Sequence, residues 1–393
     1  MSISKKMETF LTKSSWIRKM FEEGARLKTE FGAENVFDFS LGNPNVDPPP
    51  QFRQALKETV DSLGPGDHSY MPNSGYPAVR KSVADYLSEE YATKFNSDDI
   101  IMTCGAAGAL NAVLKAVLNP GEEIITPAPF FVEYGFYADN HGGSLKTVPT
   151  HSDFSLDLDA MENAVTENTR AVLINSPNNP TGQVYSEENL NRLGEILRKK
   201  SREYKRVVYL ISDEPYRKIV YGGITVPSIF SAYSDSILAT SYSKEYSIPG
   251  ERIGLIAVNP EAKFKKELTE ALTLANRILG FVNAPALMQR VVAKIQGVSV
   301  DVSQYEYKRN LLCDGLKDCG YEFTMPSGAF YLFPGTPVAD DVKFVKALQE
   351  ELILTVPGSG FGGPGHMRIS YCVDNATILG SMGGFKKVLE KFK

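Results

Sequence analysis

An alternation of short apolar runs with helical patterns, which begins at about residue 100, constrains the fold of this chain more than any other feature. Each run ends in small or polar residues, and such an alternation is typical of a parallel sheet covered by helices. Strands are predicted in the runs DIIMTCG, EEIITPAP, RAVLINSP, RVVYLISDEP, SILATSYSK and GLIAVNP. The sequence therefore predicts an α/β fold with a mostly parallel sheet.

Two segments between these runs have the spacing of helices that pack on a sheet. The segment 106–121 places apolar residues on one helical face and ends at Pro120 and Gly121. The segment 186–200 begins with Ser186, a residue type that caps helices, and has two glutamates in its first turn. The residues expected to be buried are Leu110, Val113, Leu114 and Val117 in the first helix and Leu190, Leu193, Ile196 and Leu197 in the second.

The pattern changes after about residue 290, which indicates a second structural unit. A long helical stretch is followed there by two predicted strands, GYEFTMPSGAFYLFPG and HMRISYCVD, and by a closing helix, ATILGSMGGFKKVLEKF. The first 45 or so residues should pack with this smaller α+β unit, because they precede the alternation and would otherwise lack a partner. A chain of 393 residues also exceeds the usual size of a single core. We therefore expect a large domain over 49–289 and a small domain over 1–48 and 290–393.

Composition and charge argue against several classes of function. With 42% hydrophobic residues and a net charge of -5, the chain has material for a core and no basic surplus for nucleic acid. No apolar run is long enough to cross a membrane, and the N-terminus lacks the apolar stretch of a signal peptide. The four cysteines show no CxxC spacing, so we expect reduced thiols in a cytoplasmic protein. The four histidines are scattered without ligand spacing, so no metal site is expected.

The residues that follow the predicted strands carry most of the reactive side chains. Ligands of parallel α/β sheets bind at the carboxyl ends of the strands, so these residues are the first candidates for a site. The segments 104–107, 175–182, 213–216 and 241–244 supply a helix start, an asparagine-rich turn, two acids and a lysine preceded by two serines. Such a set meets the needs of pyridoxal phosphate: a lysine for its aldehyde, an acid for its pyridine nitrogen and donors for its phosphate.

Each of these needs has a candidate residue. Lys244 could hold the aldehyde, provided that burial and nearby cations lower the pKa of its amine. Asp213 could keep the pyridine nitrogen protonated, so that the ring accepts electrons. Asn179 and Tyr216 would donate hydrogen bonds to the phenolate oxygen, and Phe131 could stack on the ring. The phosphate donors would be the side chains of Ser241, Ser243 and Arg252 and the backbone amides of Ala106 and Ala107 at a helix start.

Five segments carry a resemblance to a known family: CGAAGAL, NSPNNPTG, SDEPY, SYSKEYSIPGERIG and HMRISY. In this order they resemble class I and II aminotransferases of fold type I, and the similarity covers nearly the whole chain. The resemblance implies pyridoxal 5'-phosphate as cofactor, a large domain with a mostly parallel seven-stranded sheet, and the residue roles given above. It further implies that Arg368 binds the substrate α-carboxylate and that Gly42 makes a backbone contact with the substrate. Tyr70 matches a tyrosine that reaches the phosphate in the partner subunit, which implies a homodimer with shared sites.

The expected activity is a ping-pong transamination between an L-amino acid and a 2-oxo acid such as 2-oxoglutarate. The catalytic residues would be Lys244, Asp213 and Tyr216, and the substrate contacts Gly42, Asn179 and Arg368. The preferred donor stays open, and Arg277 is either a ligand of a distal carboxylate or a surface arginine. A β-lyase is the main alternative, because it would use the same residues to hold the ring. A cofactor-binding regulatory protein would need a DNA-binding segment, for which the short N-terminus leaves no room.

Taken singly, each of these residues also has an ordinary structural interpretation, such as a loop lysine, a helix cap or a core aromatic. The agreement of several segments in one order leaves little room for that interpretation at Lys244 and Asp213. It leaves more room at Phe131 and at Gly42, which could simply permit a turn.

Overall fold

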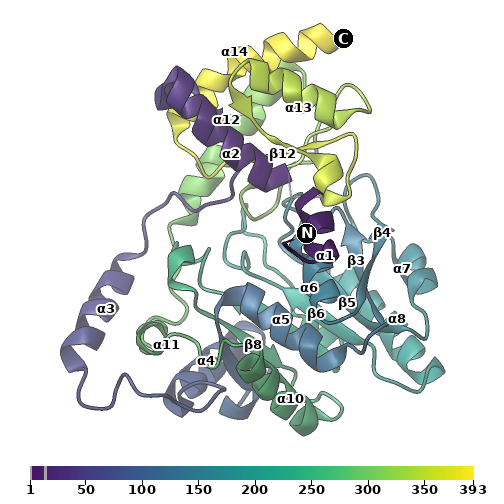
Figure 1. Cartoon of the computed structure of the whole chain (residues 1–393). Helices are drawn as coiled ribbons and strands as arrows, with labels where there is room; N and C mark the ends of the chain where they lie inside the picture. The colour runs from purple at the N-terminus through teal and green to yellow at the C-terminus, as the bar shows by residue number, and fades with distance from the viewer. Residues whose placement is uncertain (1, 13–15) are drawn as a thin grey trace.

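The computed structural model describes residues 2–12 and 16–393, and its elements form two groups (Figure 1). One group is built on a seven-stranded sheet, and the other is a smaller set of helices and short strands at the top of Figure 1. The strand order of the large sheet is β2-β8-β7-β6-β5-β3-β4, and β8 alone runs against its neighbours. The bounds are β2 (Ile100–Thr103), β3 (Glu123–Ala128), β4 (Ser144–Pro149), β5 (Thr169–Asn175), β6 (Tyr209–Asp213), β7 (Ser236–Ser241) and β8 (Gly254–Val258). The predicted α/β fold with a mostly parallel sheet is confirmed.

Both faces of this sheet are covered by apolar helix surfaces. Neighbouring residues of β5 point to opposite faces, so Val172 packs in the core under one set of helices and Leu173 in the core under the other. The helices α5, α6 and α10 cover the second of these faces. The helices of this group are α3 (Pro50–Ser62), α4 (Pro77–Glu90), α5 (Gly105–Val117), α6 (Glu133–Asn140), α7 (Leu158–Ala164), α8 (Glu187–Glu203), α9 (Ile229–Ala232), α10 (Lys265–Ile278) and α11 (Ala286–Ala293).

The two helices predicted in most detail from the sequence have the expected caps and faces. Ser186 caps α8, because its side chain accepts a hydrogen bond from the backbone N–H of Asn189. All of the residues that were expected to be buried in α5 and α8 are buried. Among the described residues, no helix combines the length and the apolar character that a membrane crossing requires.

The smaller group contains segments from the N-terminal and the C-terminal parts of the chain. Strand β1 (Phe37–Asp38) pairs in parallel with β10 (Ile353–Leu354), and a second small sheet has the order β11-β12-β9. The strands of this second sheet are β9 (Tyr331–Leu332), β11 (Val356–Pro357) and β12 (Met367–Ser370). The helices of the group are α2 (Trp16–Phe31), α12 (Val302–Cys319), α13 (Asp341–Glu350) and α14 (Asn375–Phe392). Most of the strand predicted over 320–335 was wrong, because Pro326 lacks an N–H and Ala329 has a positive φ of 56°, so only β9 forms.

Two contacts cross the domain limits that were expected from the sequence. Helix α1 (Lys5–Thr12) lies on α6 of the large sheet, where Lys6 pairs with Asp139 at 2.5 Å and the ring centroids of Phe10 and Phe136 are 4.9 Å apart. The limit at residue 290 falls within α11, which packs against α3 and α4. The division into 49–289 and 1–48 with 290–393 therefore stays a prediction.

Candidate active site

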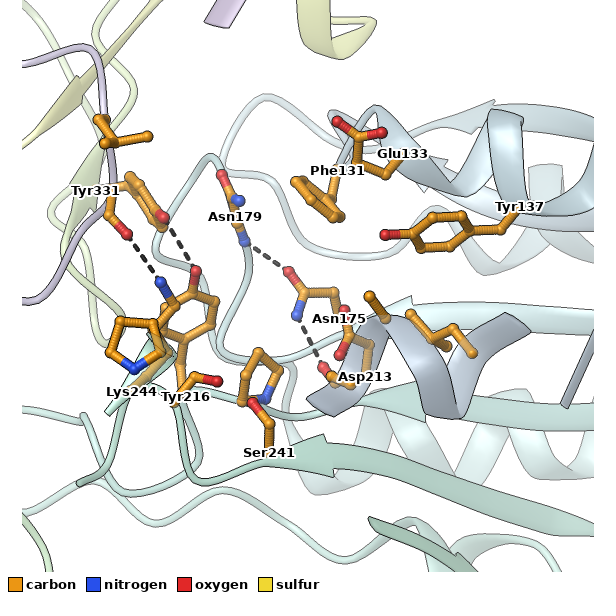
Figure 2. Close-up of a pocket in the computed structure, with 18 of the residues that line it drawn as sticks. Phe131, Glu133, Tyr137, Asn175, Asn179, Asp213, Tyr216, Ser241, Lys244 and Tyr331 are labelled. Atoms are coloured by element: carbon orange, nitrogen blue, oxygen red, sulfur yellow. Dashed lines mark hydrogen bonds between the residues drawn. The ribbon is translucent and has the colours of Figure 1, made fainter. Parts of the chain in front are cut away.

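The carboxyl ends of β5, β6 and β7 border one cavity of about 350 Å³, together with the start of α5 and residues of the smaller group (Figure 2). All of the predicted site residues except Tyr70 line it. They are Gly42, Ala106, Ala107, Phe131, Asn179, Asp213, Tyr216, Ser241, Ser243, Lys244, Arg252 and Arg368. The geometry thus brings residues from distant parts of the chain to one place, while their individual roles stay predictions.

Lys244 follows β7 and its amine lies inside the cavity. Its Nζ donates a hydrogen bond to the carbonyl oxygen of Gly42 at 2.8 Å, which ties the loop after β7 to the N-terminal segment (Figure 2). Burial lowers the pKa of Lys244 to about 8, and the positive charges of Arg368 and Arg252 act in the same direction. A lysine of this kind has a larger neutral fraction near neutral pH than an ordinary lysine, and a nucleophilic or basic amine must be neutral.

Asp213 ends β6 and has one carboxylate oxygen without a protein partner. Its Oδ2 accepts a hydrogen bond of 2.6 Å from the hydroxyl of Tyr134, whereas its Oδ1 is buried and has no partner among the described residues. Asn175 fixes the same residue through a bond of 2.7 Å from its side-chain amide to the Asp213 carbonyl oxygen. Burial raises the pKa of Asp213 to about 7, and the Tyr134 hydrogen bond counteracts that rise. A buried acceptor of this kind needs a donor from a ligand.

Arg368, on β12, is almost fully buried and only partly paired. Its Nη1 donates to Oδ1 of Asn179 at 3.1 Å and its Nη2 to the carbonyl oxygen of Ser40 at 2.6 Å. Its Nε is buried and has no partner in the described part of the chain. The guanidinium carbon lies 4.8 Å from the ring centroid of Tyr331 and 4.7 Å from that of Phe361. A planar cation held in this way suits the binding of a carboxylate.

The serines, Arg252 and the start of α5 form the part of the cavity that suits a phosphate. A methyl group added at Gly105, whose φ is +72°, would lie 3.2 Å from Nη2 of Arg252, so the guanidinium lies directly against the helix start. Arg252 itself has a left-handed backbone with φ 52°, and its Nη1 donates to the carbonyl oxygen of Pro249 at 2.9 Å. A helix N-terminus beside an arginine attracts an anion through backbone N–H groups and through charge.

Tyr331 is a cavity residue that the sequence analysis did not identify. Its hydroxyl is 2.9 Å from the hydroxyl of Tyr216 (Figure 2). A Cβ atom at Gly42 would collide with the same hydroxyl, which explains why this position needs a glycine. Tyr331 lies in a segment that was considered only as a strand, and a tyrosine in a strand gives no sign of such a contact.

Tyr134 is the second residue that was missed. It is fully buried on α6 and lies close to Phe131, with an edge-to-face ring contact of 5.6 Å between centroids. Phe131 itself lines the cavity, as a ring-stacking residue must. The one available sign was the position of Tyr134, three residues after Phe131 in the segment PAPFFVEY.

Two other candidates lie outside the cavity. Tyr70 is 91% exposed and borders a second hollow of about 450 Å³ with residues 281–284. Arg277 is exposed on α10 and does not line the cavity, which fits the surface interpretation within this chain.

The cavity fits pyridoxal phosphate on the chemistry of its donors. The unpartnered Oδ1 of Asp213 can accept from a protonated pyridine nitrogen, and Lys244 offers an amine for the aldehyde. The serines and Arg252 at the start of α5 provide donors for a phosphate dianion.

Known proteins support the same assignment. Residues 34–379 match the family described as aminotransferase class I and II. A probable aspartate aminotransferase of Methanocaldococcus jannaschii is 31% identical over 392 residues, which cover 96% of this chain and 98% of that protein. The crystal structure of an amino transferase from Eubacterium rectale matches with a TM-score of 0.97 and 41% identity, and covers 100% of both chains. Aspartate aminotransferase from Thermus thermophilus, solved with maleate, has a TM-score of 0.87 and 26% identity over 99% of this chain and 100% of that chain.

The chain belongs to the class I and II aminotransferases. It is a pyridoxal 5'-phosphate-dependent transaminase, an enzyme that moves an amino group between amino acid and 2-oxo acid substrates. The fold and cofactor expected from the sequence are therefore confirmed.

Proposed function

We propose that the cavity catalyses a ping-pong transamination in which Lys244 moves the proton and Asp213 stabilises the charge. The single observation that carries this assignment is the pairing of an amine of lowered pKa with a carboxylate that has one unpartnered oxygen in the same cavity. The bound cofactor supplies an electron sink for the charge that is released at the substrate Cα. The further steps belong to residues of this chain.

The donor amino acid would be oriented by its α-carboxylate. Arg368 has a guanidinium that contacts two aromatic rings and an Nε without a partner among the described residues, so a carboxylate can bind without a large rearrangement of the side chain. Asn179, which already accepts from Arg368, and the backbone of Gly42 border the same space. This binding would place the Cα proton within reach of the Lys244 amine.

Lys244 would act as the base and then as the acid. Its neutral amine would take the proton from Cα and return it two atoms away, at the carbon of the cofactor aldehyde. Water would then release the 2-oxo acid, and the amino group would stay on the cofactor until a second 2-oxo acid accepts it. Asp213 would stay ionised to balance a protonated ring nitrogen, and Tyr134 holds its carboxylate in place through the 2.6 Å hydrogen bond. Tyr216 would donate a hydrogen bond to the phenolate oxygen from its place in the cavity wall.

The finer parts of the function are proposals as well. The acceptor would be a 2-oxo acid, with 2-oxoglutarate as the first to test, although Arg368 provides for only one of its two carboxylates. A homodimer would complete the site through the exposed Tyr70 of the other subunit. A cytoplasmic location agrees with four free thiols, of which two are buried and two partly buried.

The test is a spectrophotometric half-reaction. The purified enzyme with its cofactor is mixed with each amino acid in turn, and the loss of the visible cofactor band is recorded together with the release of the 2-oxo acid. Lys244→Ala should abolish both the visible band and turnover, because Lys244 is the one lysine among the described residues that line the cavity. Lys263→Ala, at an exposed lysine outside the cavity, is the matched control and should behave like the wild type.

Two results would contradict the proposal. Turnover by Lys244→Ala at the wild-type rate would remove Lys244 from the mechanism. Ammonia and a 2-oxo acid released over many turnovers without any acceptor would indicate a β-lyase instead.

A further inference from the structure

One charged residue of the cavity has no part in the proposed function. The charged side chains that line the cavity are Glu133, Asp213, Lys244, Arg252 and Arg368. The last four are assigned to the ring nitrogen, the aldehyde, the phosphate and the α-carboxylate. The side chain of the substrate must therefore share the remaining space with Glu133, and among the residues that the structure describes no further cation lines the wall.

Glu133 is a carboxylate without a cation beside it. It is the first residue of α6 and is partly buried, and neither a hydrogen bond nor an ion pair joins its side chain to any other residue that the structure describes. Burial raises the pKa of Glu133, and no positive charge in the described part of the chain lowers it again. A carboxylate needed only for stability would more often be paired at this depth.

The charge of Glu133 acts on the cavity itself. Figure 2 shows Glu133 beside Phe131, on the side of the cavity opposite Lys244 and Tyr331. Tyr137 lines the same wall, and the pKa of its hydroxyl is raised by burial first and then by the charges of Glu133 and Asp213. The negative potential of Glu133 thus reaches a polar group on the cavity surface.

We propose that Glu133 sets the donor specificity of this transaminase: it disfavours amino acids with a second carboxylate and favours those whose side chain ends in a hydrogen-bond donor, an amide or an ammonium. A second carboxylate in this cavity, on a donor or on an acceptor such as 2-oxoglutarate, would be repelled by Glu133, whereas an N–H donor could bond to it. We therefore expect 2-oxoglutarate to be a weaker acceptor than a 2-oxo acid whose side chain ends in an amide. The inference rests on the proposed function, because it takes the cavity as the place where the substrate binds.

This specificity would separate the chain from several relatives. Among them are proteins named as aspartate aminotransferases, and the Thermus thermophilus structure was solved with maleate, a dicarboxylate. Membership of the family does not fix the donor, because the residues that hold the cofactor are separate from those that meet the substrate side chain.

The experiment uses two pairs of donors of equal size, asparagine with aspartate and glutamine with glutamate. The half-reaction rate of the wild-type holoenzyme is measured for each donor, and the ratio of kcat/KM for amide over acid is calculated. We expect the wild type to prefer the amides, and Glu133→Gln to lower that preference by about tenfold or more, because the substitution removes the charge and keeps the shape. Glu188→Gln, at an exposed glutamate of α8 outside the cavity, makes the same change of charge and should leave the ratio unchanged.

Other results would overturn the inference. An equal effect of Glu133→Gln on amides and acids would mean that Glu133 acts only on the structure. A specific loss of aspartate and glutamate would mean that a cation, for example from a second subunit, uses Glu133 to bind acids. If Glu133→Gln fails to fold, Glu133→Ala removes the same charge and is judged by the same ratio. Failure of the proposed function would be distinguishable from failure of this inference, because the wild type would then convert none of the donors.

Discussion

Asp213 illustrates how a single contact sets the chemistry of the cavity. Burial alone would favour the protonated acid, and the hydrogen bond from Tyr134 favours the ionised form that a positive ring nitrogen requires. The hydroxyl also occupies Oδ2, which leaves Oδ1 for a ligand. In the proposed mechanism Tyr134 is therefore a positioning residue, because it acts through Asp213.

We predict that Tyr134→Phe raises the pKa of Asp213 above its present value of about 7. The active carboxylate is lost as the pH falls through its pKa, so the acid limb of the kcat profile should move to higher pH, by about one unit for a lost bond to a charged group. The measurement is kcat against pH for wild type and variant. Tyr233→Phe removes a comparable buried hydrogen bond, from Tyr233 to the carbonyl oxygen of Val208, away from the cavity, and should leave the acid limb in place. An unshifted limb in Tyr134→Phe would contradict the assigned role.

For single residues, the sequence was enough to predict site residues that lie in recognisable segments. It was not enough to predict residues whose contacts with the cavity depend on how the elements pack. Lys244 and Asp213 each follow a predicted strand, so their place near the cavity could be inferred. Tyr134 and Tyr331 could not, because each acts through one hydroxyl whose direction depends on how α6 and β9 pack. Glu133 gave no sign either, since a glutamate at a helix start is common.

The proposed binding of the cofactor phosphate depends most on the start of α5. Gly105 has a positive φ, and its lack of a side chain lets the Arg252 guanidinium approach the first turn. We predict that Gly105→Ala lowers the free energy of unfolding by about 1 kcal/mol, because alanine is strained at this φ. It should also raise the cofactor Kd roughly tenfold or more through the displaced arginine.

Cofactor titration and chemical denaturation measure these two effects. The matched control is Gly250→Ala in the same region, where an added methyl group would meet nothing within 4 Å and the φ is not positive. If Gly105→Ala bound the cofactor as tightly as the control, the contact between α5 and Arg252 would have no part in phosphate binding.

Elements were predicted well where burial makes their pattern clear. The inner strands β5 to β8 are apolar on both faces and stand out in the sequence. β4 was not located, because it lies at the edge of the sheet and the segment SLKTVP has one buried residue, Val148. The two-residue strands β1, β10 and β11 could not be recognised from sequence, since two residues carry no periodicity. The longer β12 lies in the predicted strand HMRISYCVD, which is confirmed.

The whole molecule offers a test of the proposed homodimer. Tyr70 lies outside the cavity of its own chain, and its side chain is 91% exposed. Packing within the described chain therefore does not account for a tyrosine at this position. Lys244→Ala and Tyr70→Ala should each have low activity alone, and a mixture of the two, after dissociation and reassociation, should regain activity. A hybrid dimer contains one site with both residues intact, if the tyrosine serves the other subunit. No recovery, in hybrids shown by mass spectrometry to have formed, would contradict shared sites.

The reversal of β8 limits how this enzyme can vary. Because β8 runs back beside β7, one connection carries both Lys244 and Arg252, and its two ends are fixed in adjacent strands. One extra residue between them would lengthen the path by up to about 3.5 Å, more than a hydrogen bond can absorb. If Lys244 and Arg252 hold the two ends of the cofactor as proposed, the length of this connection must match the distance between the aldehyde and the phosphate, and insertions should be tolerated less here than in loops that carry no such pair.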